Sequence, residues 1–323
     1  MDTLNCLGID IAKKTFDVGL LRNDKFRNKK FPNNSEGFNQ LDAWLLKQGA
    51  IRVHACLEAT GSYSEALAIH LHQVGHMVSL VNPARIKAFG QTELQRNKTD
   101  RADAMLIARF CSKHHPAFWT PAPPEIRELQ ALVRHLDDLI GTRSQLANRL
   151  SDGLQIESVL ESLRALTKAL DAEIKLTKKK IRELLDRHPG LKADRDLLVT
   201  IPGIAEQTAI KLLAEIQHLR DYKHARQAAA YAGLSPQLID SGTSLKRTRL
   251  SKTGNGRVRK ALYMPAIVAS RYNPVLREFS NRLSQRGKSK MVIIGAVMRK
   301  LLHLAFGVLK TRKPFDPNHA IAA

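Results

Sequence analysis

The first 110 residues of this chain alternate short strand patterns with helical patterns, and this alternation limits the possible fold more than any other feature. Strands are predicted at residues 4–10, 15–22, 25–31, 52–58 and 76–81. Helices are predicted at 35–47, with Asn34 or Ser35 as the cap, and at 63–74. The first three strands are closely spaced, so a meander precedes the helical connections. We therefore expect an α/β unit at the N-terminus.

Four carboxylates lie where such a unit would bring them together. Asp10 and Glu58 each close a predicted strand, while Asp100 and Asp103 open a third predicted helix. The two members of an Asp-x-x-Asp pair share one face of a helix. An oxygen-rich cluster of this kind suits Mg²⁺ in phosphodiester chemistry. Taken singly, each acid is explained as a cap, a solvated strand end or a helix N-terminal charge, but their joint order in a basic protein favours a metal site.

The roles of these acids follow from their positions. Asp10, on the central strand, would bridge metal ions, and the other three would complete the shell and orient phosphate or water. The order of strands and helices that carries them is the order used by an RNase H-like fold.

The net charge of +22 over 323 residues is placed unevenly. Residues 190–323 carry 24 basic and 8 acidic side chains, whereas residues 124–189 carry 12 and 11. A field of this sign attracts polyphosphate without choosing a sequence, so nucleic acid is the expected partner. We find no apolar stretch that approaches the ~20 residues needed to cross a bilayer, and we therefore expect a cytoplasmic protein without membrane contact. The three cysteines lack zinc-site spacing and are expected to be core thiols.

Proline content and helix periodicity divide the rest of the chain. Residues 114–124 contain four prolines and are predicted to be a linker. Residues 125–189 have the pattern of two amphipathic helices with a break near 151–153. This segment is either a self-contained antiparallel hairpin or a dimerising coiled coil, and the sequence does not decide between them. A basic, mostly helical domain is predicted at 190–323.

Two features of the basic domain suggest contact with phosphate. The turn at Gly203, with the helix pattern that follows it, has the form of a helix-hairpin-helix, although a simple turn between helices has the same pattern. Ser241 lies in a glycine-flanked loop and could be a nucleophile, but most serines in such loops form turns or donate to phosphate. Seven basic residues follow it, and we expect them to bind nucleic acid: Lys246, Arg247, Arg249, Lys252, Arg257, Arg259 and Lys260.

Taken in order, these motifs resemble the IS110 family of insertion-sequence transposases, which are relatives of the Piv invertase and are understood as bridge-RNA-guided recombinases. The resemblance covers nearly the whole chain. The matching motifs are G-I-D-I-A-K at 8–13, L-E-A-T-G at 57–61, N-K-T-D-x-x-D-A at 97–104, I-P-G-I at 201–204, A-G-L-S-P at 232–236 and S-G at 241–242.

The resemblance implies a RuvC-like domain at 1–113, a Pro-rich linker at 114–124, a coiled coil at 125–189 and a transposase domain at 190–323. It implies that Asp10, Glu58, Asp100 and Asp103 hold Mg²⁺ and that the nucleophile is Ser241. The implied partners are donor and target DNA, a noncoding bridge RNA, and further copies of the chain in a dimer that pairs into a tetramer. The acidic cluster of one subunit would then act with the serine of another.

Two other functions fit parts of the same pattern. A metal-dependent nuclease of the Holliday-junction-resolvase type would use water as the attacking group, and Ser241 would only contact phosphate. A non-catalytic nucleic-acid-binding protein would use the basic domain alone. We expect a bacterial, nucleoid-associated recombinase in the cytoplasm.

Overall fold

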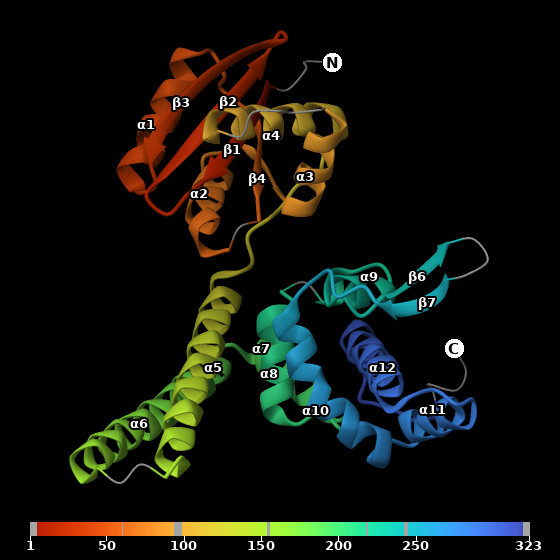
Figure 1. Cartoon of the computed structure of the whole chain (residues 1–323). Helices are drawn as coiled ribbons and strands as arrows, with labels where there is room; N and C mark the ends of the chain where they lie inside the picture. Colours follow the sequence, from red (N-terminus) through yellow and green to blue (C-terminus); the bar gives the residue numbers. More distant parts are fainter. Residues whose placement is uncertain are drawn as a thin grey trace. The chain divides into compact units, whose positions relative to one another are not determined.

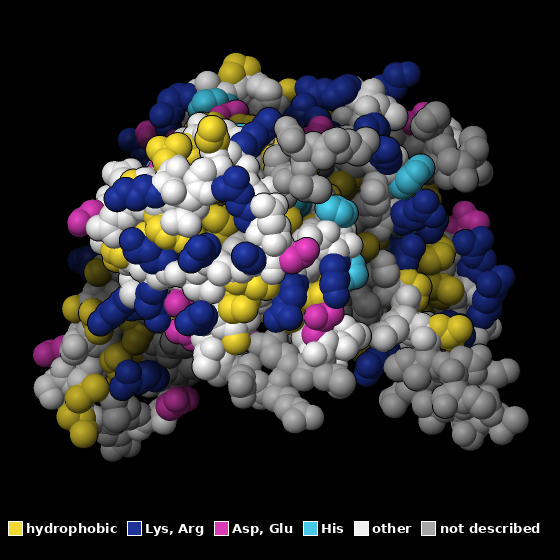
Figure 2. All heavy atoms as spheres, turned by 90° about the horizontal axis from the view of Figure 1, so that it is seen from above, with side chains coloured by type: hydrophobic (Ala, Val, Ile, Leu, Met, Phe, Trp, Pro, Cys, Tyr) yellow, Lys and Arg dark blue, Asp and Glu magenta, His cyan; other side chains and the backbone are white. Residues whose placement is uncertain are grey.

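The computed structural model of the chain describes residues 5–59, 61–93, 99–153, 156–217, 219–241 and 245–318. The chain forms two compact units, Met1–Pro121 and Ala122–Ala323, which we call the N-terminal unit and the C-terminal unit (Figure 1). The surplus of basic residues is visible on the face drawn in Figure 2, where Lys and Arg side chains are more frequent than Asp and Glu side chains.

The N-terminal unit is built on a five-stranded sheet in the order β3-β2-β1-β4-β5. Its strands are β1 (Asn5–Ile11), β2 (Thr15–Arg22), β3 (Lys25–Pro32), β4 (Val53–Glu58) and β5 (Met77–Val81). The first three strands pair antiparallel, and β4 pairs parallel with both β1 and β5. This mixed sheet confirms the predicted meander followed by helical connections, and with it the RNase H-like fold class.

Four helices pack against this sheet: α1 (Ser35–Lys47), α2 (Ser62–Gln73), α3 (Pro83–Thr92) and α4 (Asp100–His114). The cap of α1 is Asn34, whose side chain accepts a hydrogen bond of 2.9 Å from the Gly37 amide. Helix α3 was not predicted, although Asn82 and Pro83 are a helix-start signal. The Asn82 side chain indeed accepts a 2.9 Å hydrogen bond from the Ala84 amide.

The two faces of the sheet have separate cores. Leu7 and Ile9 of β1 pack with residues of α1 and α2, while Cys6 packs with residues of α3 and α4. Because side chains alternate along a strand, Gly8 and Asp10 lie on the same face as Cys6. The face that carries Asp10 is therefore the one that α4 covers. The three cysteines are free and buried, as predicted, and all lie in the core of this face.

The C-terminal unit is mostly helical, as predicted. Its elements are α5 (Pro124–Ser151), α6 (Glu157–Arg187), α7 (Pro189–Val199), α8 (Glu206–Glu215), the 3-10 turn η1 (Leu219–Asp221), α9 (Ala225–Tyr231), β6 (Pro236–Ser241), β7 (Leu245–Leu250), α10 (Gly256–Tyr272), α11 (Pro274–Gln285) and α12 (Lys290–Thr311). Helices α5 and α6 lie side by side as a hairpin within one chain (Figure 1). Association of two such hairpins stays a prediction.

One hydrophobic core runs through the C-terminal unit, from α5 to α12. Helix α12 is long and apolar enough to cross a membrane by length and composition, which the sequence analysis overlooked. Half of its apolar stretch is nevertheless buried inside the protein, and Leu301, Leu302 and Ala305 are completely buried. We therefore assign α12 as a core helix.

Candidate active site

A pair of glycines lets α4 lie directly on the sheet. Gly8 of β1 and Gly19 of β2 are register partners. A Cβ on Gly8 would lie 2.1 Å from the Ala104 carbonyl oxygen, and one on Gly19 would lie 3.1 Å from the same oxygen. Any larger residue at Gly8 would push the helix away. The glycine pair thus brings the first turn of α4, with its two aspartates, close to the end of β1.

The pKa of Asp10 reflects the closeness of these acids. Burial, together with the charges of Asp103, Asp100 and Asp17, raises the pKa of the Asp10 carboxyl to about 6. Desolvation and like charges both disfavour a carboxylate. The structure thus brings three of the four predicted acids near one another, and it adds Asp17, which is the cross-strand partner of Asp10.

A lysine from the next strand neutralises part of this charge. Lys30 of β3 is the register partner of Asp17. Its Nζ lies 3.1 Å from Oδ2 of Asp17 and 3.2 Å from Oδ2 of Asp100. These hydrogen bonds raise the pKa of the Lys30 ammonium. Neither Asp17 nor Lys30 was predicted. The sequence signal for Asp17 was an acid inside the otherwise apolar alternation of β2.

Glu58 ends β4 at the same end of the sheet. Ile9 pairs with Leu57 in the parallel ladder, so Glu58 is the residue on β4 that follows the partner of Ile9. Among the described residues, however, no three His, Cys, Asp or Glu side chains lie close enough to hold a metal ion as they stand. The acids are neighbours but not an assembled ligand set, and their role as metal ligands stays a prediction. Their chemistry fits, because hard carboxylate oxygens suit Mg²⁺ and a divalent cation would relieve the repulsion at Asp10.

Ser241 lies at the tip of a strand hairpin that the sequence analysis read as a loop. Strands β6 and β7 pair from Pro236 with Leu250 to Ser241 with Leu245. Residues 242–244 are outside the described part of the chain, and so are the side chains of Ser241, Lys246 and Arg247. The hairpin escaped prediction because the described side chains of β6, those of residues 236–238, are all exposed and show no alternation of burial. Leu238 among them is 67% exposed.

The base of this hairpin is held by Arg259. Its Nη1 donates hydrogen bonds to the carbonyls of Ala232 (2.8 Å) and Gly254 (3.2 Å). Gly233 has φ +66°, and a Cβ there would lie 3.0 Å from backbone atoms of Lys252 and Thr253 and 2.5 Å from the same Nη1, which together explain the glycine in the A-G-L-S-P motif. Arg259 thus has a structural role in the described structure. The other predicted nucleic-acid contacts with described side chains are exposed: Arg249, Lys252, Arg257 and Lys260.

A buried acid connects the α5–α6 helical hairpin to the base of the β6–β7 strand hairpin. Glu215 of α8, with a side chain 4% exposed, accepts hydrogen bonds from Nε (2.8 Å) and Nη2 (3.0 Å) of Arg134 on α5. It also accepts a bond of 3.0 Å from Nδ2 of Asn255, the cap of α10. Burial opposes its ionisation, yet the bonds from Arg134 and Asn255 bring the pKa of Glu215 below its ordinary value. Neither helix carries a sequence pattern that predicts this network.

The predicted helix-hairpin-helix is formed by α7, a turn and α8. Gly203 in this turn has φ +107°, and a Cβ there would lie 2.5 Å from the Cβ of Ala269 on α10. The turn conformation and the close packing on α10 both require glycine. A contact between this turn and DNA phosphate stays a prediction.

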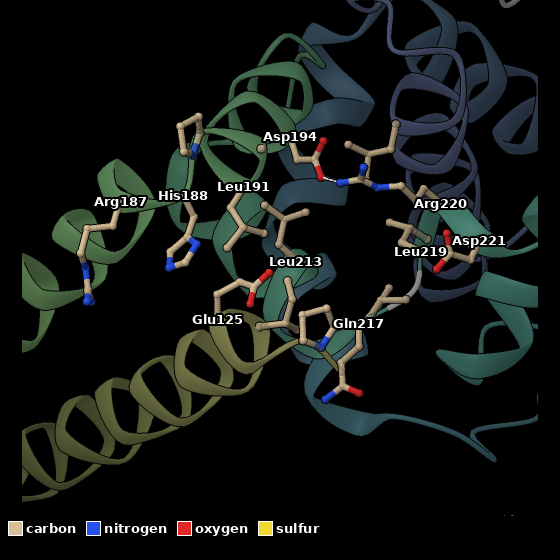
Figure 3. Close-up of a pocket in the computed structure, with 16 residues that line it drawn as sticks. Glu125, Arg187, His188, Leu191, Asp194, Leu213, Gln217, Leu219, Arg220 and Asp221 are labelled. Atoms are coloured by element: carbon tan, nitrogen blue, oxygen red, sulfur yellow. Dashed lines mark hydrogen bonds and ion pairs between the residues drawn. The ribbon is translucent and has the colours of Figure 1, made fainter. Parts of the chain in front are cut away.

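The C-terminal unit also contains a cavity with both polar and apolar lining residues. It is lined by residues from α5, the α6–α7 junction, α8 and η1 (Figure 3). Its buried acid, Asp194, forms ion pairs with Arg220 and Arg312, which tie α7 to η1 and to the end of α12. None of the predicted catalytic residues lines it.

Comparisons with known proteins agree with this picture. A DEDD transposase family model matches residues 7–158, and a transposase model of the IS116/IS110/IS902 family matches residues 195–281. The pilin gene-inverting protein of Moraxella bovis is 35% identical over 321 residues, covering 96% of this chain and 97% of that protein. The transposase for insertion sequence element IS1328 of Yersinia enterocolitica is 26% identical, covering 95% and 97%. The transposase for IS1111A of Coxiella burnetii is 26% identical, covering 81% and 77%.

Proposed function

We propose, from the premise that this chain belongs to the IS110 family of transposases, that it moves an insertion sequence by RNA-guided recombination through a covalent serine–DNA intermediate. Family membership itself establishes phosphoryl transfer on DNA and implies a divalent metal. The guide RNA, the serine intermediate and Mg²⁺ as the ion are the added steps. The observation that carries the proposal is the gathering of acids around Asp10, whose pKa is raised to about 6.

The N-terminal unit would supply the metal end of the reaction. Asp10, Glu58, Asp100 and Asp103 would hold Mg²⁺, which when bound supplies Lewis-acid polarisation of the scissile phosphate. Lys30, which bridges Asp17 and Asp100 at 3.1 and 3.2 Å, would offset part of the negative charge of the acids until the metal binds. The carboxylates must be ionised to act, so the raised pKa of Asp10 favours activity above about pH 6.

The C-terminal unit would supply the nucleophile. Ser241 Oγ would form a bond to phosphorus while the bond from phosphorus to one deoxyribose oxygen breaks, and that oxygen would leave as a hydroxyl group. Because one phosphodiester replaces another, rejoining would need no outside energy. The position of Ser241 at the end of a strand pair supports this role. The basic side chains after it would neutralise the phosphate.

Guidance would be left to base pairing. A noncoding bridge RNA would pair with donor and target DNA, while the basic residues from Lys246 to Lys260 would hold backbones without reading sequence. The active form would be a dimer of dimers in the bacterial cytoplasm, with the acidic cluster of one subunit beside Ser241 of another. Exposed Leu166 (51%) and Leu176 (43%) on α6 support association through the helical hairpin.

A strand-cleavage assay tests the proposal. The purified protein, Mg²⁺, RNA transcribed from the flank of the element, and labelled donor and target duplexes are combined. Cleavage is expected to disappear in Ser241→Ala, in Asp10→Asn and without the RNA. If Ser241→Ala still cuts while Asp10→Asn does not, water is the attacking group and the resolvase-type nuclease is correct. If the parent protein binds both duplexes and cuts neither, the chain acts only by binding.

A further inference from the structure

One face of α10 leaves large apolar side chains in solvent. Met264, Val268 and Tyr272 are 60%, 41% and 72% exposed. Their spacing of four residues places them in one row along the helix. The opposite side of α10 is buried in the core through Val258, Leu262, Ala266 and Ala269. A row of large exposed apolar side chains on a protein surface marks a site that a partner covers.

Further apolar side chains are exposed on another side of α10 and on the neighbouring helix. Tyr263 lies about 100° around the helix from Met264, and its hydroxyl lies 4.0 Å from the sulfur of Met291 on α12. Met291 and Val292 are 63% and 52% exposed. The row from Met264 to Tyr272 is separate from these side chains, and its length of about 12 Å along the helix points to a macromolecular partner.

Cations lie at both ends of the same row. Arg257 and Lys260 precede Met264 by seven and four residues, Arg271 follows it by seven, and all three are exposed. These spacings keep them on the face of Met264. No Asp or Glu occurs between Asp240 and Glu278. A surface that is apolar in the middle and cationic at both ends complements a partner with anionic edges and a less polar interior.

We propose that this face of α10 binds the major groove of duplex DNA, with its three cations on phosphates and its apolar row against base edges. The major groove of B-DNA is about 12 Å wide and admits a helix with side chains about 10–12 Å across. From Arg257 to Arg271 the helix rises about 21 Å, so its ends reach beyond the groove toward the phosphates. Thymine methyl groups offer apolar contacts in that groove.

Duplex RNA does not fit this face in the same way. Its major groove is deep and narrow, so a helix face cannot reach the base edges, and only phosphate contacts remain. The inference rests on the DNA substrate of the proposed function. It is independent of Ser241, of metal and of the guide RNA, because it concerns duplex binding alone.

Binding of the full-length protein to a labelled 24-base-pair DNA duplex, without Mg²⁺ or guide RNA, tests the proposal by fluorescence anisotropy over a salt series. One variant combines Arg257→Gln, Lys260→Gln and Arg271→Gln, and another combines Met264→Ser, Val268→Ser and Tyr272→Ser. The matched controls change exposed residues of the N-terminal unit, namely Lys25, Lys47 and Lys87 to Gln, and Leu46, Ile51 and Val74 to Ser. Thermal melts check folding, and Tyr272→Ser alone replaces the triple variant if that variant unfolds.

The basic variant is expected to lower the slope of log affinity against log salt by about 3, near 0.9 for each lost phosphate contact. The apolar variant is expected to lose about tenfold in DNA affinity with no change in slope, since apolar contacts release no counterions. Its affinity for an RNA duplex of the same sequence should be unchanged, and so should the DNA affinity of both controls.

Three results would overturn the inference. An apolar variant with unaltered DNA affinity would show that the row does not touch DNA. An equal loss on the RNA duplex would show general backbone binding instead of groove binding. Unaltered DNA affinity together with a lower mass by light scattering would make the row a contact between subunits. Failure of the Ser241 cleavage test would overturn the serine mechanism and leave this binding result in place.

Discussion

The two compact units handle charge in opposite ways. In the N-terminal unit, like charges are gathered: Asp10 lies near Asp17, Asp100 and Asp103, and the exposed Lys30 pairs with Asp17 and Asp100. In the C-terminal unit, the buried acids Glu215 and Asp194 are each bonded to arginine, and many further cations remain at the surface. A site for a metal cation holds carboxylates that repel one another until the cation binds. A surface for a polyanion instead exposes an excess of positive charge to solvent. Substitutions can test each half of this comparison.

The largest effect is expected at the gathered acids. Asp10→Asn should reduce strand cleavage by about a thousandfold or more, because the attacking and leaving oxygens lose their electrostatic support. The same change should raise the melting temperature of the metal-free protein at pH 7.5, because it removes a partly buried charge that is repelled by neighbouring carboxylates. Cleavage assays and calorimetry measure the two effects. A lower melting temperature would mean that Asp10 is a structural acid.

The next effect concerns the paired acid of the other unit. Arg134→Met leaves Glu215 buried without its two bonds from the guanidinium group, and should cost about 3–5 kcal/mol in the free energy of unfolding. The matched control is Arg143→Met, whose pair with Asp171 is 43% and 52% exposed and should contribute about 0–1 kcal/mol. Chemical denaturation measures both. Equal losses would contradict the account of a buried network that anchors α5.

A smaller effect is expected beneath the acids. Gly8→Ala inserts a methyl group 2.1 Å from the Ala104 carbonyl, so α4 must move, at a cost of about 1–3 kcal/mol. The helical Gly141 of α5 has no heavy atom within 4 Å of an added Cβ, and Gly141→Ala should stabilise by up to about 1 kcal/mol. Gly8→Ala should also weaken Mn²⁺ binding measured by calorimetry. Normal Mn²⁺ binding in Gly8→Ala would show that the contact between Gly8 and α4 does not position the metal ligands.

The smallest effect depends on pH and has opposite signs in the two units. Burial, with the charges of Arg299 and Lys300, lowers the pKa of His303 to about 4 from 6.5. Below about pH 6.5 the imidazole binds a proton in the unfolded chain but stays neutral in the folded chain. The contribution of His303 to the free energy of unfolding is therefore complete above pH 6.5 and is lost as the pH falls toward 4. For Asp10 the raised pKa reverses the sign, and stability is lost as the pH rises from 3.8 to about 6.

Thermal melts of the metal-free protein between pH 4 and 8 should therefore show opposite changes in one pH window. His303→Gln should remove the stability loss that accompanies a fall from pH 6.5 to 4, and Asp10→Asn should remove the stability loss that accompanies a rise from pH 4 to about 6. We expect changes of about 1 kcal/mol for His303, whose ring is only partly buried. A profile for His303→Gln that parallels the parent protein below pH 6.5 would show that another group causes the acid-side loss.

Local patterns predicted most of the N-terminal unit. Strands and caps depend on neighbouring residues, and Asp10 and Glu58 were found because each follows an apolar run. Asp17 and Lys30 were not found, because their place beside Asp10 and Asp100 depends on the register between strands and on a helix 70 residues further along the chain. Strand-end acids are therefore easier to predict than the counter-ion that faces them.

Prediction was weaker in the C-terminal unit because its site is made of distant contacts. The pair of Glu215 with Arg134 joins residues 81 apart, and no periodicity of either helix indicates it. Arg259 was predicted to bind nucleic acid by its place in a basic run, whereas its guanidinium bonds two backbone carbonyls. Charge density predicts a binding surface, but it does not distinguish the cations that hold the fold.

The most direct test of the account is a search for a covalent protein–DNA adduct in cells that carry the intact element, with the modified peptide identified by mass spectrometry. The account predicts an adduct on the peptide that contains Ser241, and its loss in both Ser241→Ala and Asp10→Ala. Cut DNA without an adduct, persisting in Ser241→Ala, would contradict the account and would establish water as the attacking group.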